Sequence, residues 1–427
     1  MKKLLQSKKR GSAVPLALVA IMILLAMGVG LLSLGFNGRI YSMRTASDIA
    51  ARCAADAGLT MALFEMNEKL QVKPWKDSTL PQATDVSLPN CNAVCSYRVT
   101  GDLGGGYVIT SIGESGLARR GVRATIGLQG AFNHAILTKK GLILKSGTLV
   151  DGYNSLDPLD TDVTVDIGTQ SALDSSIILN MGVTVDGDVF VGGGDLDTVI
   201  KDQGATVTGD KYASAQEPLP RVTAPALPDK GSIFAQGQTV TITPADSGTY
   251  TAIDLKLLST KVKEVGKVSI PSVLEVSGGD VVLHVTGDIQ LGNSCEIVVK
   301  DGSTLTIYAD GNIHCRLDSS ISTENPPEEA ATIQLYATGQ GTQFFDVKAK
   351  SQWAGIIYAP DADVDLYAKG DAYGSVVAND FEFKAGGNFH YDKALSKNVS
   401  VNDEAVCFVV KRWHESSSRF AAWEATQ

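Results

Sequence analysis

Three aspartates in the C-terminal half alternate along the chain in a pattern that could support acid–base chemistry. Asp361, Asp363 and Asp365 are separated by single residues, so a strand would place their carboxylates on one face. Paired carboxylates are what glycoside hydrolysis requires. The same alternation is typical of any strand with one face in water, and no Gly-x-Ser-x-Gly motif accompanies it. The sequence therefore favours a non-enzymatic protein and predicts no catalytic residue.

Two other sets of residues could bind metal ions. Aspartates crowd residues 151–202, but their spacing fits neither an EF-hand nor a Gly-Gly-x-Gly-x-Asp repeat, so we interpret them as solvated turn residues and leave calcium binding open. The adjacent pair His314 and Cys315 does not supply the four ligands of a zinc site. We therefore predict no metal and no cofactor. Each of the five histidines is predicted at a turn or on the surface: His134, His284, His314, His390 and His414.

From about Phe132 onward the sequence repeats a phrase of alternating apolar residues around a Gly-Asp or Asp-Gly-Asn turn. Neighbouring turns recur at roughly 20 residues, the length of one coil in many β-solenoids, and one coil alone cannot bury its apolar face. We predict a mainly β protein with a β-solenoid head over residues 132–399, and a β-sandwich is the alternative. Clear copies of the phrase begin at Val183, Val281 and Leu305.

Two segments depart from this repeat. The four prolines of residues 215–231 cannot lie in a central strand, so this segment is predicted to be an extended crossover or linker. Residues 400–427 are predicted to cap the last coil, because an open end would expose strand edges. The aromatic residues of the late coils either fill the core or form an exposed row that binds a glycan or another subunit. The aromatic residues of the predicted cap are Trp413, Phe420 and Trp423.

The residues before the head predict a helix followed by an antiparallel sheet. Apolar and small residues recur at helical spacing across residues 12–72, with an interruption possible near Asn37 and Gly38. Residues 73–131 then show alternation, with three short strands between Ser96 and Gly130. We interpret the triple glycine between the first two of these strands as a hairpin turn, because a phosphate loop would lead into a helix.

The N-terminus combines a basic tract with an apolar run that is long enough to span a membrane. The run from Ser12 to Phe36 exceeds the roughly 20 residues that a hydrocarbon core requires. Five basic residues precede the run and two follow it closely, which predicts a cytoplasmic N-terminus and a body outside the cytoplasm. The net charge of −10 makes nucleic acid an improbable main partner, because such a surface needs clustered positive charge.

The basic tract ends in a sequence that resembles a known processing site. Residues 8–12, Lys-Lys-Arg-Gly-Ser, are similar to the site at which prepilin peptidases cut type IV prepilins. The resemblance implies cleavage between Gly11 and Ser12, which removes a leader of residues 1–11 and leaves the apolar helix on the mature protein. Major pilins carry glutamate at the fifth mature position, where this chain has Leu16. That departure favours a minor or tip-like component. A plain single-span anchor is the alternative.

Two further stretches extend the resemblance to PilX-type pilus-assembly proteins. Residues 51–63 resemble the end of the N-terminal helix in that family, and their small side chains would pack on a sheet or on neighbouring helices. Residues 355–395 resemble the β-helical domain of unknown function attached to many PilX-like proteins. The resemblance implies a minor pilin or pseudopilin of the bacterial inner membrane that displays its head in the periplasm or on a pilus. It implies prepilin peptidase and other pilins as partners, and a surface or glycan ligand of the head remains possible.

Three other functions stay open. They are a membrane-anchored envelope enzyme that acts on glycans, a surface adhesin outside any pilus, and a bactofilin-like scaffold that polymerises through solenoid ends, which the acidic head and outward topology oppose.

A body outside the cytoplasm would permit disulfides between its six cysteines. Cys91 and Cys95 could close a small loop, and Cys295 and Cys315 are about one repeat apart, which could place them in neighbouring layers. The pairing stays open. The cysteines without an evident partner are Cys53 and Cys407.

Overall fold

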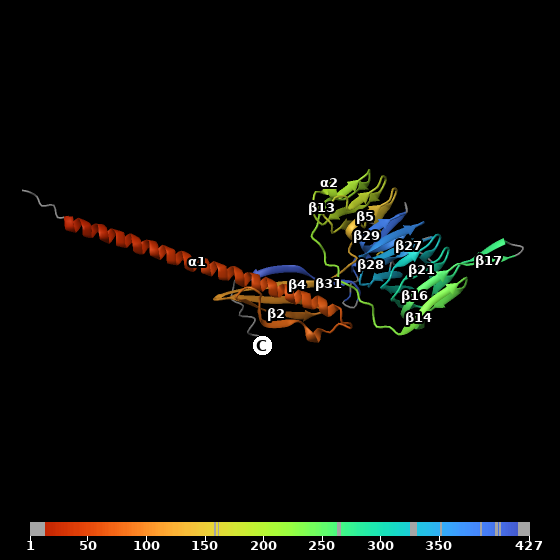
Figure 1. Cartoon of the computed structure of the whole chain (residues 1–427), viewed down its shortest axis with the longest axis horizontal. Helices are drawn as coiled ribbons and strands as arrows, with labels where there is room; N and C mark the ends of the chain where they lie inside the picture. The colour runs from red at the N-terminus through yellow and green to blue at the C-terminus, as the bar shows by residue number, and fades with distance from the viewer. Residues whose placement is uncertain are drawn as a thin grey trace, which may run out of the picture. The chain divides into compact units, whose positions relative to one another are not determined.

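The computed structural model describes residues 13–157, 159–160, 162–262, 266–324, 331–350, 352–384, 387–397, 400 and 403–416. The chain divides into two compact units (Figure 1). The first unit comprises Met1–Glu68, Lys76–Gly127 and Val409–Gln427, and the second comprises Lys69–Trp75 and Leu128–Phe408. The predicted processing residues Gly11 and Ser12 lie outside the described residues.

The first element, α1 (Ala13–Leu70), is one continuous helix of 58 residues. Pro15 is tolerated because the first four N–H groups of a helix have no intrahelical partner. The interruption that we considered near Asn37 and Gly38 does not occur, since an isolated glycine costs a helix only about 1 kcal/mol. Residues 14–46 are exposed in this unit. By length and composition, α1 could cross a membrane.

The first unit also contains a five-stranded sheet with the order β1-β2-β3-β4-β31. Strands β1 to β4 form an antiparallel meander, as the alternation predicted. The C-terminal strand β31 carries Trp413 and extends this sheet beside β4, a role that the sequence analysis missed when it assigned these residues to a cap. The elements are η1 (Asp77–Thr79), β1 (Gln82–Ser87), β2 (Ala93–Asp102), β3 (Gly106–Ser115), β4 (Ala118–Gly130) and β31 (Val406–Ser416).

The small-residue face of α1 packs directly on this sheet. Ala51, Ala54 and Ala55 are fully buried, and a Cβ atom built on Gly113 of β3 would lie 2.0 Å from the Ala51 carbonyl oxygen. The helix and strand backbones are therefore in contact, which larger side chains would prevent. The sheet is thus one of the two packing partners that the sequence analysis considered for this face.

The second unit is built from parallel strands that stack on one another. Strand pairs in the described part of this unit are parallel except for the β17–β18 hairpin, unlike the antiparallel sheets of the alternative β-sandwich. Val281 of β20 pairs with Leu305 of β23, which pairs with Ile333 of β26, so one layer follows another every 24 to 28 residues here. The inward side chains of these strands form one continuous apolar core.

The strands of the second unit form three hydrogen-bonded sheets. The 20-stranded sheet contains β5 (Ile136–Leu144), β6 (Leu149–Tyr153), β7 (Val165–Thr169), β8 (Ile177–Leu179), β9 (Thr184–Val185), β10 (Gly187–Val191), β11 (Ile200–Asp202), β12 (Thr206–Val207), β13 (Lys211–Ala213), β14 (Asp229–Gln236), β16 (Gly248–Lys256), β20 (Asp280–Val285), β21 (Ile289–Leu291), β23 (Thr304–Ala309), β24 (Ile313–Cys315), β26 (Ile333–Ala337), β27 (Gln343–Ala349), β28 (Trp353–Ala368), β29 (Ala372–Phe383) and β30 (Asn388–Asp392). The four-stranded sheet contains β15 (Thr239–Ile242), β19 (Val273–Val276), β22 (Glu296–Val299) and β25 (Ser320–Thr323), and the hairpin contains β17 (Leu258–Val262) and β18 (Gly266–Ile270). The short helices are α2 (Leu196–Val199), η2 (Pro244–Asp246) and α3 (Ala394–Lys397).

The order of the layers in space differs from their order along the chain. Strand β5 pairs with β7 on one side and with β29 on the other, so the chain enters the stack in its middle. It winds outward to β13, and residues 214–228, the crossover, then carry it to β14 at the opposite end (Figure 1). From β14 the chain winds back until β30 pairs with β6. The proline-rich segment is thus extended, and it connects the two ends of the stack.

Candidate binding groove

The three aspartates with the most suggestive spacing all lie on β28 and are neutralised or hydrogen-bonded. The carboxylate of Asp361 accepts from Lys139 Nζ at 2.7 Å, and that of Asp365 accepts from Lys384 Nζ at 2.5 Å. Asp363 accepts from Asn379 Nδ2 at 2.7 Å and pairs in register with Asp380. These contacts are typical of a solvated outer face. They place the three side chains in a charged hydrogen-bonded surface.

Asp380 is the carboxyl group of this surface with an altered protonation equilibrium. Burial raises its pKa, and the neighbouring Asp363 charge raises it further. Asn379 Nδ2 donates to both Asp363 and Asp380, which holds the two carboxyl groups together.

A column of aromatic side chains follows the outer face of the neighbouring part of the stack. Parallel register places His284, Tyr308, Tyr336 and Tyr358 one above the other on β20, β23, β26 and β28. The rings of Tyr308 and Tyr336 stack with centroids 5.2 Å apart and planes at 17°. Burial raises the pKa of all three tyrosines, so their hydroxyls stay protonated. The second column, also in register, consists of Val282, Thr306, Gln334 and Ile356.

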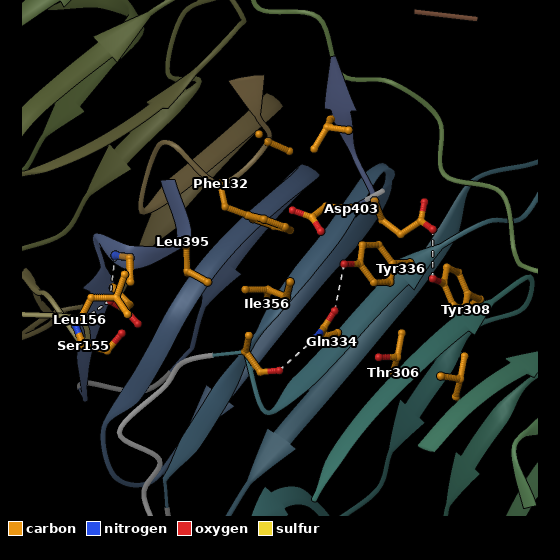
Figure 2. Close-up of a pocket in the computed structure, with 18 residues that line it drawn as sticks. Phe132, Ser155, Leu156, Thr306, Tyr308, Gln334, Tyr336, Ile356, Leu395 and Asp403 are labelled. Atoms are coloured by element: carbon orange, nitrogen blue, oxygen red, sulfur yellow. Dashed lines mark hydrogen bonds between the residues drawn. The ribbon is translucent and has the colours of Figure 1, made fainter. Parts of the chain in front are cut away.

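Six residues of these two columns form the floor of an open groove with a volume of about 460 Å³ (Figure 2): Tyr308, Tyr336, Val282, Thr306, Gln334 and Ile356. Phe132, Leu395 and the exposed Leu156 line its other side. The following aromatic residues are buried, so they form no exposed row. Trp353, Phe381, Phe383 and Phe389 fill the core, whereas Tyr336 and Tyr358 pack in a separate cluster on the outer face.

Carboxylates give the groove a negative rim. Asp392, Asp403 and Glu404 line it, and no lysine, arginine or histidine does so among the described residues. Glu404 accepts a hydrogen bond from Tyr308 at 3.3 Å and forms an ion pair with Lys73 at 2.5 Å. The Tyr336 hydroxyl donates to Gln334 Oε1 at 3.1 Å. Sequence reasoning missed the groove because its residues come from eight separate stretches of the chain, and the in-register tyrosines were its one local signal.

The crossover lies on the same outer surface. Leu219, Val222 and Ala224 pack with the cluster that contains the tyrosine column, and the Tyr358 hydroxyl donates to the Pro220 carbonyl oxygen at 2.6 Å. Arg221 lies 3.7 Å from Asp361. An extended proline-rich peptide is therefore recognised here by an apolar contact, a tyrosine hydroxyl and a carboxylate.

A mostly buried histidine, His134, holds the start of the crossover. His134 Nε2 lies 3.0 Å from a Glu217 carboxylate oxygen, while Nδ1 lies 3.7 Å from Asp166, which is too long for a hydrogen bond. Burial alone would lower the pKa of His134, but the two carboxylates outweigh it and raise the pKa to about 9. Gln129 and Gln170 contact the same glutamate, and Phe190 packs on the imidazole ring. His134 lies at a bend of the chain, as predicted, but its side chain is mostly buried and not at the surface.

We expect the crossover to loosen when His134 loses its proton. Because the folded pKa is raised from 6.5, the stabilisation is complete below pH 6.5 and is lost as the pH rises through about 9. His134→Gln should therefore accelerate tryptic cleavage after Arg221 by about 100-fold at pH 6.5, equivalent to about 3 kcal/mol. At pH 9.5 the cleavage rate of the variant should approach that of the wild type. His414→Gln, at an exposed position on β31, is the control. If the ratio of the two cleavage rates does not change with pH, protonated His134 does not stabilise the crossover.

The remaining expectations concern thiols, other histidines and metals. Within the described residues, no disulfide joins any of the six cysteines. Cys295 and Cys315 do lie in neighbouring layers, but Cys315 pairs in register with Leu291, so the two thiols are not opposite one another. Within the described residues, no group of three or more His, Cys, Asp or Glu side chains is arranged to hold a metal ion. His284 and His390 face outward from strands next to Asp310 and Asp151.

Comparison with known proteins adds two similarities. Residues 229–398 match a domain of unknown function, DUF7305, and the match begins at the first residue of β14. The crystal structure of the competence-associated pilin ComZ from Thermus thermophilus matches with 13% sequence identity and a TM-score of 0.20, over 87% of this chain and 97% of that chain. A TM-score this low supports no conclusion about the present chain. No curated protein matches the sequence.

Proposed function

We propose that this chain is a non-enzymatic component of a type IV pilus or pseudopilus, of the minor or tip-like kind, that displays a β-solenoid head outside the cytoplasm. The observation that carries the proposal is α1. Its first part exposes an unbroken apolar surface, and its later small-residue face packs on an antiparallel meander. An exposed apolar helix of this length needs a lipid bilayer or other apolar helices around it.

The parallel stack supports the β-solenoid head. Each layer pairs in register with the next, and the side chains that point inward are apolar in layer after layer, as the repeat predicted. A rigid stack of this kind suits display and contact. Its partners would be prepilin peptidase and other pilins, through the processing site and α1.

The N-terminal peptide mass of the protein isolated from its own membrane tests the proposal. We expect a chain that begins at Ser12 with a methylated amine. Gly11→Ile should block this processing, because it places a large side chain at the proposed cleavage site, whereas Gly38→Ile on the exposed part of α1 should be processed normally. A wild-type chain that begins at Met1 would leave a single-span anchor and exclude the pilin pathway.

A further inference from the structure

The groove continues a surface on which this protein already binds a proline-rich peptide of its own. The crossover and the groove share the cluster that contains Tyr308, Tyr336 and Tyr358. Asp403, Glu404 and Val406 lie between them, because they line both the groove and a second pocket beside Arg221 and Pro225. The crossover occupies one part of the tyrosine column, and the groove leaves another part open.

The contacts of the crossover define what such a surface recognises. A tyrosine hydroxyl donates to the carbonyl oxygen of Pro220, Leu219 and Val222 pack against the apolar cluster, and Arg221 lies near a carboxylate. An extended proline-rich segment loses little conformational entropy when it docks, which favours this mode of binding.

The groove offers related features in one place. Ile356, Phe132 and Leu395 provide apolar surface. The hydroxyls of Tyr308 and Tyr336 donate to Glu404 and Gln334, so they offer a peptide N–H their acceptor oxygens (Figure 2). No basic side chain is among the described lining residues. Glu404 is paired with Lys73 and Asp392 is 1% exposed, so the exposed Asp403 supplies the carboxylate for a ligand. We propose that this groove binds an extended, proline-containing peptide segment with a basic residue, supplied by another protein.

The ring geometry favours a peptide over a glycan. Sugars stack on exposed aromatic faces, but Tyr308 and Tyr336 stack on each other and are 6% and 4% exposed. Their faces are therefore covered, and the apolar side chains of the groove and the Asp403 carboxylate remain available. The volume of about 460 Å³ lies within the range of about 300–1,000 Å³ that is typical of ligand sites.

Fluorescence anisotropy with the full chain in detergent micelles tests the inference. The probe is a fluorescein-labelled peptide with the sequence of residues 216–224, Gln-Glu-Pro-Leu-Pro-Arg-Val-Thr-Ala. We expect a Kd on the order of 10–100 μM, as befits a short peptide that buries little area. Thr306→Trp, on the groove floor, should weaken binding at least about tenfold by filling the groove. Thr241→Trp, exposed on β15 of the same unit, should leave the Kd unchanged and is the matched control.

The charge requirement is tested by a double-mutant cycle. Asp403→Asn should weaken the wild-type peptide several-fold but should have little effect on a peptide in which arginine is replaced by glutamine. No binding at millimolar peptide would overturn the inference. Equal binding to Thr306→Trp and wild type would also overturn it, because the peptide would then be exchanging with the crossover at its own site. Displacement of the peptide by neutral oligosaccharides would identify a glycan groove instead. The assay does not depend on pilus assembly, so the inference and the proposed function can fail separately.

Discussion

Replacing Gly113 with alanine should separate α1 from the sheet of the first unit. The new Cβ atom would lie 2.0 Å from the Ala51 carbonyl oxygen and 2.4 Å from the Ala55 nitrogen. Both atoms belong to the helix backbone and cannot rotate away, so the helix must shift. We expect the packing of the helix on the sheet to lose about 3 kcal/mol of stability, which is at the upper end of the penalty for overpacking.

Cys95 reports this separation directly. Its side chain is fully buried beneath the helix, 3.2 Å from the Cβ position of Gly58, and burial raises its pKa. After the exposed Cys53 and Cys91 are blocked, mass spectrometry should show Cys95 reacting with a thiol reagent about 100-fold faster in Gly113→Ala than in wild type.

Gly104→Ala provides the matched control for this substitution. A Cβ atom there would meet nothing closer than Asp102 Oδ1 at 3.5 Å, so the labelling rate should stay at the wild-type value. An unchanged rate in Gly113→Ala would show that the small-residue face does not hold the helix on the sheet.

Replacing Trp353 with alanine should produce the largest loss of stability in the second unit. Trp353 is fully buried in the core and pairs in register with Ala372 of the next layer. Its removal leaves a cavity that the small neighbour cannot fill, and we expect a loss of about 3–5 kcal/mol in the free energy of unfolding. The guanidinium midpoint of the β-sheet circular dichroism signal should fall accordingly.

Two other substitutions distinguish this packing effect from the loss of a tryptophan as such. Trp413→Ala, at a side chain that is 45% exposed, should cost about 1 kcal/mol or less. Trp353→Phe should lower the free energy of unfolding much less than Trp353→Ala does. Phenylalanine keeps most of the side-chain volume, and the substitution removes a buried indole N–H that has no hydrogen-bond partner. Equal losses for Trp353→Ala and Trp413→Ala would contradict the assignment of Trp353 to the core.

Local patterns predicted much of the fold because they report which side of an element is buried. The alternation at Val183, Val185 and Val189 predicted inward residues, and all three are fully buried. The prolines of residues 215–231 predicted an extended segment, since proline cannot donate to a strand ladder. The small residues near Gly58 predicted close backbone contact, and the helix lies against β3.

The groove was beyond the reach of these patterns. Its floor needs Tyr308 and Tyr336 in register, and its sides need Phe132, Leu395 and Glu404, which come from distant parts of the chain. The buried histidine at position 134 was missed for the same reason, because Glu217 is 83 residues away. The sequence around a residue does not show partners that lie this far away along the chain.

The sequence by itself determined the long apolar helix, the antiparallel meander, the repeating β layers and the extended crossover, because each depends on the periodicity or backbone restrictions of neighbouring residues. The tertiary structure alone decided that β5 lies between β29 and β7, that β31 joins the first sheet, and that a groove forms above the tyrosines. The physical reason is that parallel strands offer similar hydrogen-bonding edges, so the choice between them is made by side-chain packing across the whole stack.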